Sequence, residues 1–302
     1  MTSTVQVVGY DAGEGARVGV MQDGKIYASN SYRTTDELLA DWDAASLRLK
    51  ADAFTPPLGT RTPVAGARLL SPILAPRNIF FAGANYRDHV EEMIRETGAP
   101  LDRNPKANGI KPWHSIKATG SSVVGPDAVV ARPQETKMLD WEIELAVIIG
   151  RKASNVSEAD ALNYVAGYTV ANDLSARDHV GRNGVPDNSP FKWDWIGQKS
   201  FDGSCPMGPA MTPASAIADP QNLDMKLWVN GVLKQDSNTG QMIFSIAEQL
   251  SYLSSRITLQ PGDVILTGTP SGVGMATRTF LQAGDVVRQW IDGIGSFDIT
   301  VS

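Results

Sequence analysis

The last third of the chain consists of short apolar runs separated by tight-turn signals, and this pattern constrains the fold most strongly. Beyond Pro209, Asn-Gly and Gly-Asp pairs fall at 230–231, 262–263 and 284–285. Such residues accept the backbone angles that turns between strands require. One helical segment, 244–255, interrupts the strands. The pattern predicts an α+β fold with a mixed β-roll or β-sandwich core and peripheral helices, rather than a doubly wound parallel sheet.

The N-terminal part shows a different pattern. Residues 5–9 and 16–20 resemble short strands, Asp23-Gly24 is typical of a hairpin turn, and 35–42 has a capping residue and helical spacing. Prolines then keep the segment 53–76 extended, at Pro56, Pro57, Pro63, Pro72 and Pro76. We therefore expect a small N-terminal α/β domain with a proline-rich linker over residues 1–76, and a larger domain over residues 77–302.

Charge and apolar content exclude several kinds of partner. The chain has 27 basic and 33 acidic residues, a net charge of −6, and lacks a basic cluster able to follow a phosphate backbone. Nucleic acid is therefore not an expected partner. No run approaches the roughly 20 apolar residues of a membrane-spanning helix, and no charged segment precedes an apolar one at the start. Cys205 is the one cysteine, which fits a reducing compartment, so we expect a cytoplasmic protein without a membrane partner.

Glu142 and Glu144 are the most informative residues for function. They precede the β-branched apolar run 146–149, and alternate residues of a strand share a face. Two carboxylates about 7 Å apart repel each other by roughly 2 kcal/mol at an effective dielectric of about 20, and a cation would reverse that sign. An edge strand with a solvated face is the other interpretation of this pattern.

Asp173 adds a third carboxylate at the end of another apolar run, 165–171. Three oxygen ligands favour Mg²⁺ or Mn²⁺, with Ca²⁺ also possible, over zinc. They would leave about half of an octahedral shell open for substrate, which is typical of a catalytic metal. The alternative is that Asp173 only caps the following turn.

His89 and Glu92 lie three residues apart on an expected short helix, so the carboxylate could orient the imidazole. A histidine held in this way is a usable general base near neutral pH. The alternative is an ordinary surface pair. The irregular stretch 95–114 follows directly, and we expect it to be a lid over the substrate or a solvated insertion.

Two other candidate sites receive little support. The glycine-containing segment 267–274 lacks the spacing of a Walker or dinucleotide motif. Cys205 has no base nearby in the sequence, so we expect a buried structural thiol rather than a nucleophile. The aromatic segment 186–195 would line a pocket or form a subunit contact.

Five short segments occur in the order seen in the fumarylacetoacetate hydrolase family, and the chain resembles that family over residues 77–302. Each segment is weak alone, but five in register make a chance match improbable. They are 85–93, 140–145, 172–178, 199–202 with 206–209, and 267–274. The resemblance implies a β-roll core, a homodimer, and a dyad of His89 and Glu92 that activates water.

The resemblance also implies several contacts with the substrate. Lys199 would bind a substrate oxygen, and Lys117, Thr269 and Tyr86 match further substrate-binding positions. Arg177 could neutralise a substrate carboxylate, since a bidentate guanidinium suits a 2-oxo acid, or it could pair with Asp178.

One position departs from the family pattern. Many members carry glutamine where this chain has Val180, so a side-chain amide that would contact the substrate is missing. Either His179 replaces it, or His179 faces solvent. The identity of the distal part of the substrate is therefore open.

These observations favour an enzyme that hydrolyses a carbon–carbon bond of an acylpyruvate or other β-diketo acid. A divalent metal held by Glu142, Glu144 and Asp173 would polarise the oxygens of the 2-oxo acid. Decarboxylation of oxaloacetate and isomerisation of a hydroxymuconate-type diacid are the alternatives. A metal-binding module without turnover would keep the three carboxylates but would have no use for His89, Glu92 or Lys199.

Overall fold

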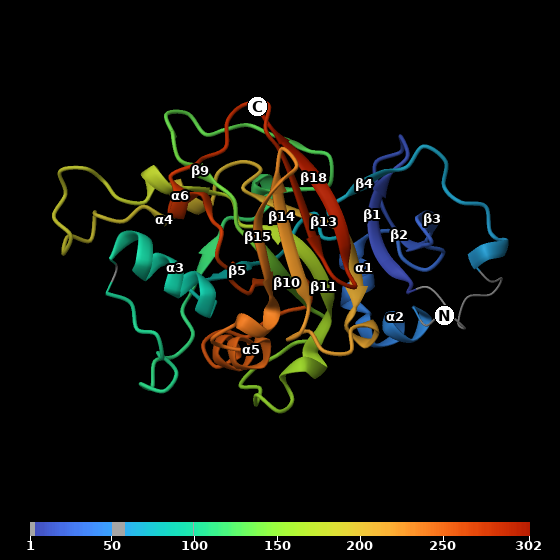
Figure 1. The fold of residues 1–302 in the computed structure, drawn as a ribbon. Helices are drawn as coiled ribbons and strands as arrows, with labels where there is room; N and C mark the ends of the chain where they lie inside the picture. Colours follow the sequence, from blue (N-terminus) through green and yellow to red (C-terminus); the bar gives the residue numbers. More distant parts are fainter. Residues whose placement is uncertain (1–3, 50–57, 99) are drawn as a thin grey trace.

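The computed structural model describes residues 4–49, 58–98 and 100–302. Pro56 and Pro57 of the expected linker lie outside the described residues. Two β-sheets dominate the described part, and the helices lie around them (Figure 1). The predicted α+β class with a mixed β core and peripheral helices is confirmed.

The larger sheet has 11 strands, with nine in the order β3-β2-β1-β13-β11-β10-β16-β5-β6, while β4 pairs with β1 and β7 with β13. Their bounds are β1 (Gln6–Asp11), β2 (Ala16–Gln22), β3 (Lys25–Ala28), β4 (Arg68–Leu70), β5 (Ile79–Ala82), β6 (His114–Lys117), β7 (Val123–Val124), β10 (Ile143–Ile149), β11 (Val165–Asn172), β13 (Cys205–Pro213) and β16 (Val264–Leu266).

The second sheet has five strands in the order β15-β14-β17-β18-β8, and β9 pairs with β12 separately. Their bounds are β8 (Val129–Val130), β9 (Leu139–Asp140), β12 (Ser175–Ala176), β14 (Asp224–Val229), β15 (Val232–Asn238), β17 (Val286–Ile291) and β18 (Gly295–Val301). The α-helices are α1 (Thr35–Ala40), α2 (Trp42–Arg48), α3 (Arg87–Thr97), α4 (Trp195–Lys199), α5 (Ile246–Ser254) and α6 (Gly274–Thr277).

Strand β10 is central because both of its faces are covered. Its odd-numbered residues, such as Leu145 and Val147, belong to a core that includes Leu227 of β14 and Val287 of β17. Ala146 and Ile148 belong to a second core that includes Trp42 of α2. This alternation follows from the two-residue period of a strand. Even-numbered residues therefore face away from the five-stranded sheet, which fixes the side on which Glu142 and Glu144 lie.

Most predicted local structure is present. Asn230 and Gly231 take the positive φ angles expected of a hairpin turn, 51° and 78°, between β14 and β15. Helix α5 begins with a capping box, in which the side chains of Ser245 and Glu248 each accept a hydrogen bond from the other residue's backbone N–H. The helix predicted over 35–42 is present as α1 over Thr35–Ala40, but it ends earlier than predicted, because non-helical Asp41 separates α1 from α2 and Trp42 belongs to α2.

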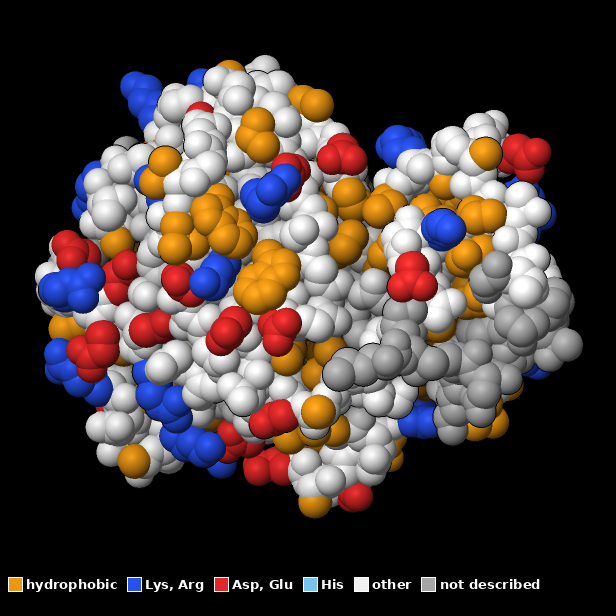
Figure 2. All heavy atoms as spheres, turned by 45° about the vertical axis from the view of Figure 1, so that its right-hand side comes forward, with side chains coloured by type: hydrophobic (Ala, Val, Ile, Leu, Met, Phe, Trp, Pro, Cys, Tyr) orange, Lys and Arg blue, Asp and Glu red, His pale blue; other side chains and the backbone are white. Residues whose placement is uncertain are grey.

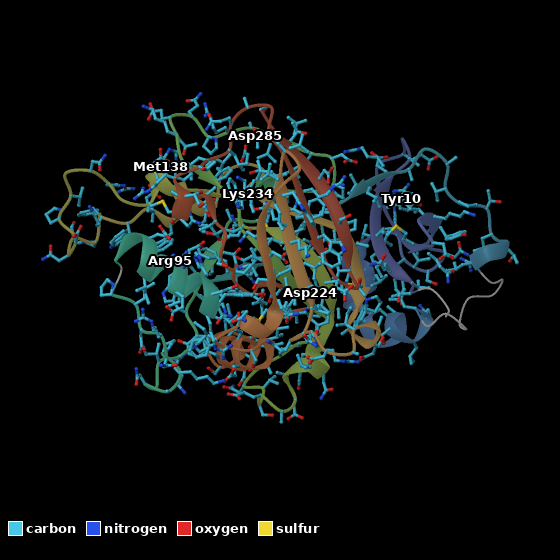
Figure 3. The ribbon with its side chains drawn as sticks, in the orientation of Figure 1. Tyr10, Arg95, Met138, Asp224, Lys234 and Asp285 are labelled. Atoms are coloured by element: carbon cyan, nitrogen blue, oxygen red, sulfur yellow. The ribbon has the colours of Figure 1, made fainter. Side chains whose placement is uncertain are left out.

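The N-terminal strands join the larger sheet instead of forming a detached one. Strand β1 pairs antiparallel with β13, where Val7 lies opposite Met211. Figure 3 labels Tyr10 in this region, on the side of the molecule away from Arg95 of α3. Figure 2 brings this side forward and shows a notch at its upper edge, between the N-terminal part and the main body. The division of the chain at residue 76 stays a prediction.

Candidate active site

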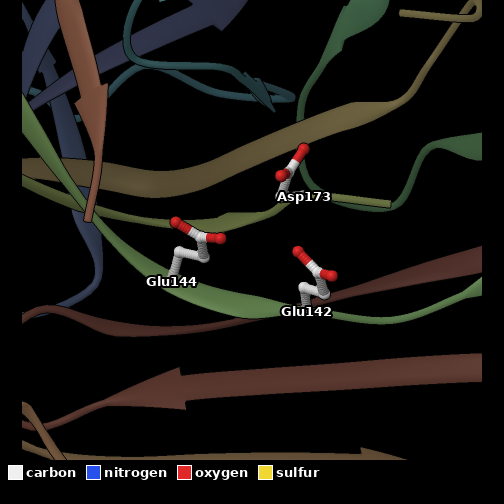
Figure 4. Close-up of side chains that lie close together, drawn as sticks. All are labelled: Glu142, Glu144 and Asp173. Carbon is white, nitrogen blue, oxygen red and sulfur yellow. The ribbon is translucent and has the colours of Figure 1, made fainter. Parts of the chain in front are cut away.

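Glu142, Glu144 and Asp173 come together at the end of β10 (Figure 4). One carboxylate oxygen from each lies within 4.8 Å of the others, and all three side chains are buried. Glu142 directly precedes β10, and Asp173 directly follows its neighbour β11. The antiparallel pairing of Ile143 with Asn172 therefore brings the carboxylates of these two separate segments together.

Hydrogen bonds fix this corner of the sheet. The Glu142 N–H donates to Asn172 Oδ1 at 2.9 Å, and the Asp173 N–H donates to the Glu142 carbonyl oxygen at 2.9 Å. Glu144 Oε2 accepts a hydrogen bond from the Gly268 N–H at 2.6 Å. Gly268 has a φ of 100°, a conformation that side chains rarely adopt, and this brings its amide to the carboxylate.

Two buried lysines lie against the carboxylates. Lys199 Nζ donates to Glu142 Oε2 and to Asp173 Oδ2, each at 2.6 Å. Lys117 Nζ lies 2.8 Å from Asp173 Oδ1. Burial alone would lower the pKa of Lys199, but the charges of Asp173 and Glu142 raise it. Lys199 is therefore a charged member of the site.

Glu144 is the least compensated of the three carboxylates. Within the described part of the chain it makes no ion pair, and burial, together with Asp173 and Glu142, raises its pKa well above the ordinary value. Burial also opposes ionisation of Glu142, but Lys199 and Arg177 hold its pKa below the ordinary value. An ionised Glu144 would therefore be repelled by Asp173 and Glu142 without an ion-pair partner of its own among the described residues.

The residues fit a divalent metal. Asp173 Oδ1 is buried and makes no hydrogen bond of good geometry among the described residues, its charged neighbour being Lys117 Nζ at 2.8 Å. All three side chains offer the carboxylate oxygens that hard cations prefer. A cation at this point would remove the repulsion that raises the pKa of Glu144. Glu142, Glu144 and Asp173 are thus the residues that would hold it.

His89 and Glu92 form a pair on α3. His89 Nδ1 lies 3.4 Å from Glu92 Oε2, and both side chains are buried. Glu92 Oε1 also accepts a hydrogen bond from the Gly272 N–H at 2.8 Å, which fixes the carboxylate against the glycine-containing segment. The interpretation as an ordinary surface pair is therefore wrong, because neither group faces bulk solvent.

A cavity of about 490 Å³ joins the two groups. His89, Glu142, Arg177, Lys199 and Thr269 line it. The Thr269 hydroxyl already donates to the Ile143 carbonyl oxygen at 2.9 Å. A smaller cavity of about 220 Å³ shares His89, Met93, Arg177 and Gln198 with the first. Apolar side chains form most of the remaining wall of the larger cavity, namely Phe81, Met93, Trp113 and Trp195.

Two predicted substrate contacts do not reach either cavity. Tyr86 is fully buried, and its hydroxyl donates to Met225 Sδ at 3.3 Å in the core beneath the second sheet. Lys117 is also fully buried, and it donates to the Ser204 carbonyl oxygen at 3.1 Å behind Asp173. In the structure, Tyr86 is a packing residue and Lys117 supports a carboxylate.

Arg177 lines the cavity but does not pair with Asp178. Its Nε donates to Asp140 Oδ2 at 2.9 Å, and its Nη2 lies 2.6 Å from Glu142 Oε1. Asp178 instead accepts hydrogen bonds from the Thr136 hydroxyl and the Lys137 N–H. The expected alternative pairing with Asp178 is therefore wrong, because the guanidinium turns toward the buried carboxylates.

The sequence interpretation missed two contributors. Asp140 is fully buried and accepts hydrogen bonds from the N–H groups of Gly274 and Met275, at 2.6 and 3.0 Å, besides its bond to Arg177. It thereby connects Arg177 to α6. Gln198 lines both cavities. The position of Asp140 two residues before Glu142 was a usable signal, whereas nothing in the sequence distinguishes Gln198.

Cys205 is buried, as expected. Burial raises the pKa of its thiol to about 12, and the thiolate is the reactive form. We predict that iodoacetamide at pH 8 modifies native Cys205 far more slowly than Cys205 of the urea-unfolded protein. Mass spectrometry after timed quenching measures both rates. Equal rates would contradict the buried, protonated thiol.

The comparisons with known proteins agree with this geometry. The sequence model of the family described as "Fumarylacetoacetate (FAA) hydrolase C-terminal" matches residues 78–302. An oxaloacetate tautomerase of Xenopus laevis, named as mitochondrial, is 42% identical over 231 residues, which cover 76% of this chain and 66% of that protein. The chain thus belongs to the fumarylacetoacetate hydrolase family.

Solved structures with related sequences share this fold. A fumarylacetoacetate hydrolase from Exiguobacterium antarcticum has a TM-score of 0.80 and 32% identity, covering 99% of each chain. A maleylpyruvate hydrolase from Sphingobium sp. SYK-6, solved with manganese(II) and pyruvate, has a TM-score of 0.74 and 30% identity, covering 98% of each chain. The family contains enzymes that act on small 2-oxo acids.

No described helix has the length and apolar character needed to cross a membrane.

Proposed function

We propose that this protein is a divalent-metal-dependent hydrolase that cleaves a carbon–carbon bond of an acylpyruvate or related β-diketo acid. The observation that carries the proposal is the His89–Glu92 pair, because its histidine lines the same cavity as Glu142. A base beside a candidate metal centre is what activation of water requires.

The roles of the side chains follow from their contacts. A divalent ion on Glu142, Glu144 and Asp173 would supply Lewis-acid polarisation of the 2-oxo acid oxygens. Arg177 faces the same cavity and would bind the substrate carboxylate. His89, oriented by Glu92, would take a proton from water as the water oxygen adds to the acyl carbonyl, whose developing charge Lys199 would stabilise. The bond between the acyl carbon and C3 then breaks, and C3 takes up a proton.

Mg²⁺ or Mn²⁺ is the metal we propose for this site. The carboxylate donor set suits both ions, and the maleylpyruvate hydrolase relative was solved with manganese. The buried single cysteine supports the proposed cytoplasmic location, although several relatives are named as mitochondrial.

The cavity wall supports a substrate with an acyl arm. The rings of Trp113 and Trp195 lie 5.3 Å apart, and that of Phe81 lies 6.0 Å from Trp113. These rings can accept an apolar or planar group next to the polar end of the cavity.

A homodimer also belongs to this proposal. Phe191, Trp193 and Ile196 are exposed by 70%, 52% and 74%, and they lie close in the sequence to Trp195, which lines the cavity. Large exposed apolar side chains gathered in one region are typical of an interaction surface. A second copy of the chain would cover them.

Tautomerisation of oxaloacetate is the second candidate, because three of the most similar relatives are named as oxaloacetate tautomerases. That reaction needs only a base that moves a proton between C3 and the neighbouring oxygen, and His89 could do this. Decarboxylation of oxaloacetate and isomerisation of a hydroxymuconate-type diacid use the same centre.

One assay panel separates these functions. The wild-type protein is incubated with Mg²⁺ or Mn²⁺ and either 2,4-dioxopentanoate, oxaloacetate or a hydroxymuconate-type diacid. Formation of pyruvate and acetate from the dioxo acid supports the hydrolase. Accelerated keto–enol exchange of oxaloacetate without cleavage of the dioxo acid would instead support the tautomerase.

The irregular stretch expected over 95–114 is shorter in the structure, because α3 continues to Thr97 and β6 begins at His114, and its longest described irregular part is 100–113. Its Arg103 contacts Glu91 of α3 at 2.9 Å, and its Lys106 contacts Glu248 of α5 at 2.5 Å. Its last residue, Trp113, lines the cavity. If this segment is a lid, limited proteolysis should cut it in the free protein, and Mg²⁺ with oxalate should protect it. Unchanged cleavage would indicate a plain surface loop.

A further inference from the structure

Gln198 of α4 has an unusual environment. The residue is 4% exposed, and its Oε1 has no hydrogen-bond partner among the described residues. Burial of an unpartnered amide group is unfavourable. The side chain nevertheless lines the cavity that contains Glu142 and Lys199, as well as the smaller cavity behind it. Its carboxamide is therefore available to a ligand that enters either cavity.

The other polar side chains at this junction are already engaged. His89 contacts Glu92, Arg177 contacts Asp140 and Glu142, and Lys199 contacts Glu142 and Asp173. A ligand can share these groups but must compete with their present partners. Gln198 Oε1 is thus a hydrogen-bond acceptor on the cavity wall that a ligand can use without breaking a contact.

Helix α4 holds Gln198 in place before any ligand arrives. The Asp194 side chain caps the helix by accepting from the Gly197 N–H at 2.8 Å, and the Gln198 N–H donates to the Asp194 carbonyl oxygen at 3.1 Å. The next residue, Lys199, is fixed by two carboxylates. A group fixed in this way loses little conformational entropy on binding.

Val180 lines the smaller cavity together with Gln198. An apolar side chain at position 180 can offer no hydrogen bond to a ligand, whereas Gln198 reaches the same cavity from a separate helix with an amide. We propose that the Gln198 carboxamide binds the oxygen at C4 of a 2,4-dioxo acid and thereby selects such acids over simple 2-oxo acids. The unpartnered Oε1 accepts from the C4 hydroxyl of the enol form, and the amide N–H can donate to the 4-oxo oxygen of the keto form. This inference rests on the proposed function, which places the 2-oxo acid end of the substrate at Glu142, Glu144 and Asp173.

The test compares two ligands that differ only in the 4-oxo group, 2,4-dioxopentanoate and 2-oxopentanoate. Binding is measured by calorimetry with saturating Mg²⁺ in a His89→Ala background, so that cleavage does not consume the ligand. Adding Gln198→Leu should weaken binding of the dioxo acid by about tenfold, the usual effect of one hydrogen bond. Affinity for 2-oxopentanoate should stay unchanged.

Gln282→Leu is the matched control, because it makes the same chemical change at an exposed position and should leave both affinities unchanged. An equal loss for both ligands, or no loss for either, overturns the proposal. If circular dichroism shows that Gln198→Leu does not fold, the binding measurement is repeated with Gln198→Asn. The Asn side chain is one methylene shorter, so its amide no longer reaches the ligand, and this variant should also lose the preference for the dioxo acid.

Ligand binding is measured here without turnover, so this result is independent of the hydrolase assay. If the wild-type protein fails to cleave 2,4-dioxopentanoate, the proposed hydrolase reaction is wrong. If the Gln198→Leu variant still prefers 2,4-dioxopentanoate over 2-oxopentanoate, only the proposed role of the Gln198 amide is wrong.

Discussion

The Glu144→Gln variant should lose divalent-metal binding and all turnover while remaining folded. The substitution removes one negative charge at nearly constant volume, and the amide oxygen of the new side chain can still accept the hydrogen bond that Glu144 accepts from Gly268. Replacing residues that merely orient metal ligands usually costs 10–100-fold in affinity, so losing a ligand should cost at least about a hundredfold. Calorimetric titration of Mg²⁺ into both proteins measures the difference.

A matched control is available at Glu158, which is exposed. Glu158→Gln removes the same charge and should leave the affinity for Mg²⁺ unchanged. Thermal unfolding in the presence of EDTA checks that Glu144→Gln is folded. If wild type and Glu144→Gln bind Mg²⁺ with equal affinity, Glu144 is not a metal ligand. The interpretation of the three carboxylates as a metal site would then be wrong.

The His89→Ala variant should abolish cleavage of 2,4-dioxopentanoate, with a loss of about 10² to 10⁴ in kcat, the usual contribution of a general base. The metal ligands are untouched, so the affinity for Mg²⁺ should remain. Decarboxylation of oxaloacetate, if present, should fall much less, because it requires no activation of water. Both activities are measured on one preparation at saturating Mg²⁺.

The Glu92→Gln variant tests whether the carboxylate orients the imidazole. Glu92 touches His89 at 3.4 Å and also accepts from the Gly272 N–H, so its loss should misplace the ring without removing it. The decrease in cleavage should therefore be smaller than that of His89→Ala. If His89→Ala cleaves 2,4-dioxopentanoate at the wild-type rate, His89 is not the general base. The proposal of a lyase or isomerase should then replace that of a hydrolase.

Short-range patterns were sufficient to predict much of the candidate site. The two-residue period of a strand placed Glu142 and Glu144 on one side, and the three-residue spacing on a helix brought His89 to Glu92. Asp173 was predictable because it ends an apolar run. The alternation of turns and strands beyond Pro209 similarly predicted the sheet that covers β10.

Contacts between distant segments were not predictable in this way. Lys117 reaches Asp173, and Arg177 reaches Asp140, only because the sheet brings these segments together. Tyr86 lies next to a predicted catalytic helix, but whether it faces the cavity or the core depends on Met225, far along the chain. The buried amide of Gln198 has no sequence signal because its significance comes from a missing partner.

The N-terminal strands have a consequence beyond their own stability. Strand β13 pairs with β11 on one side, while on the other it pairs with β7 at Cys205 and Pro206 and with β1 at Met211. Without β1, the second half of β13 would become an open edge with unpaired backbone groups, which readily pair with other chains. The segment before residue 78, outside the family match, thus protects the sheet that carries the site from aggregation.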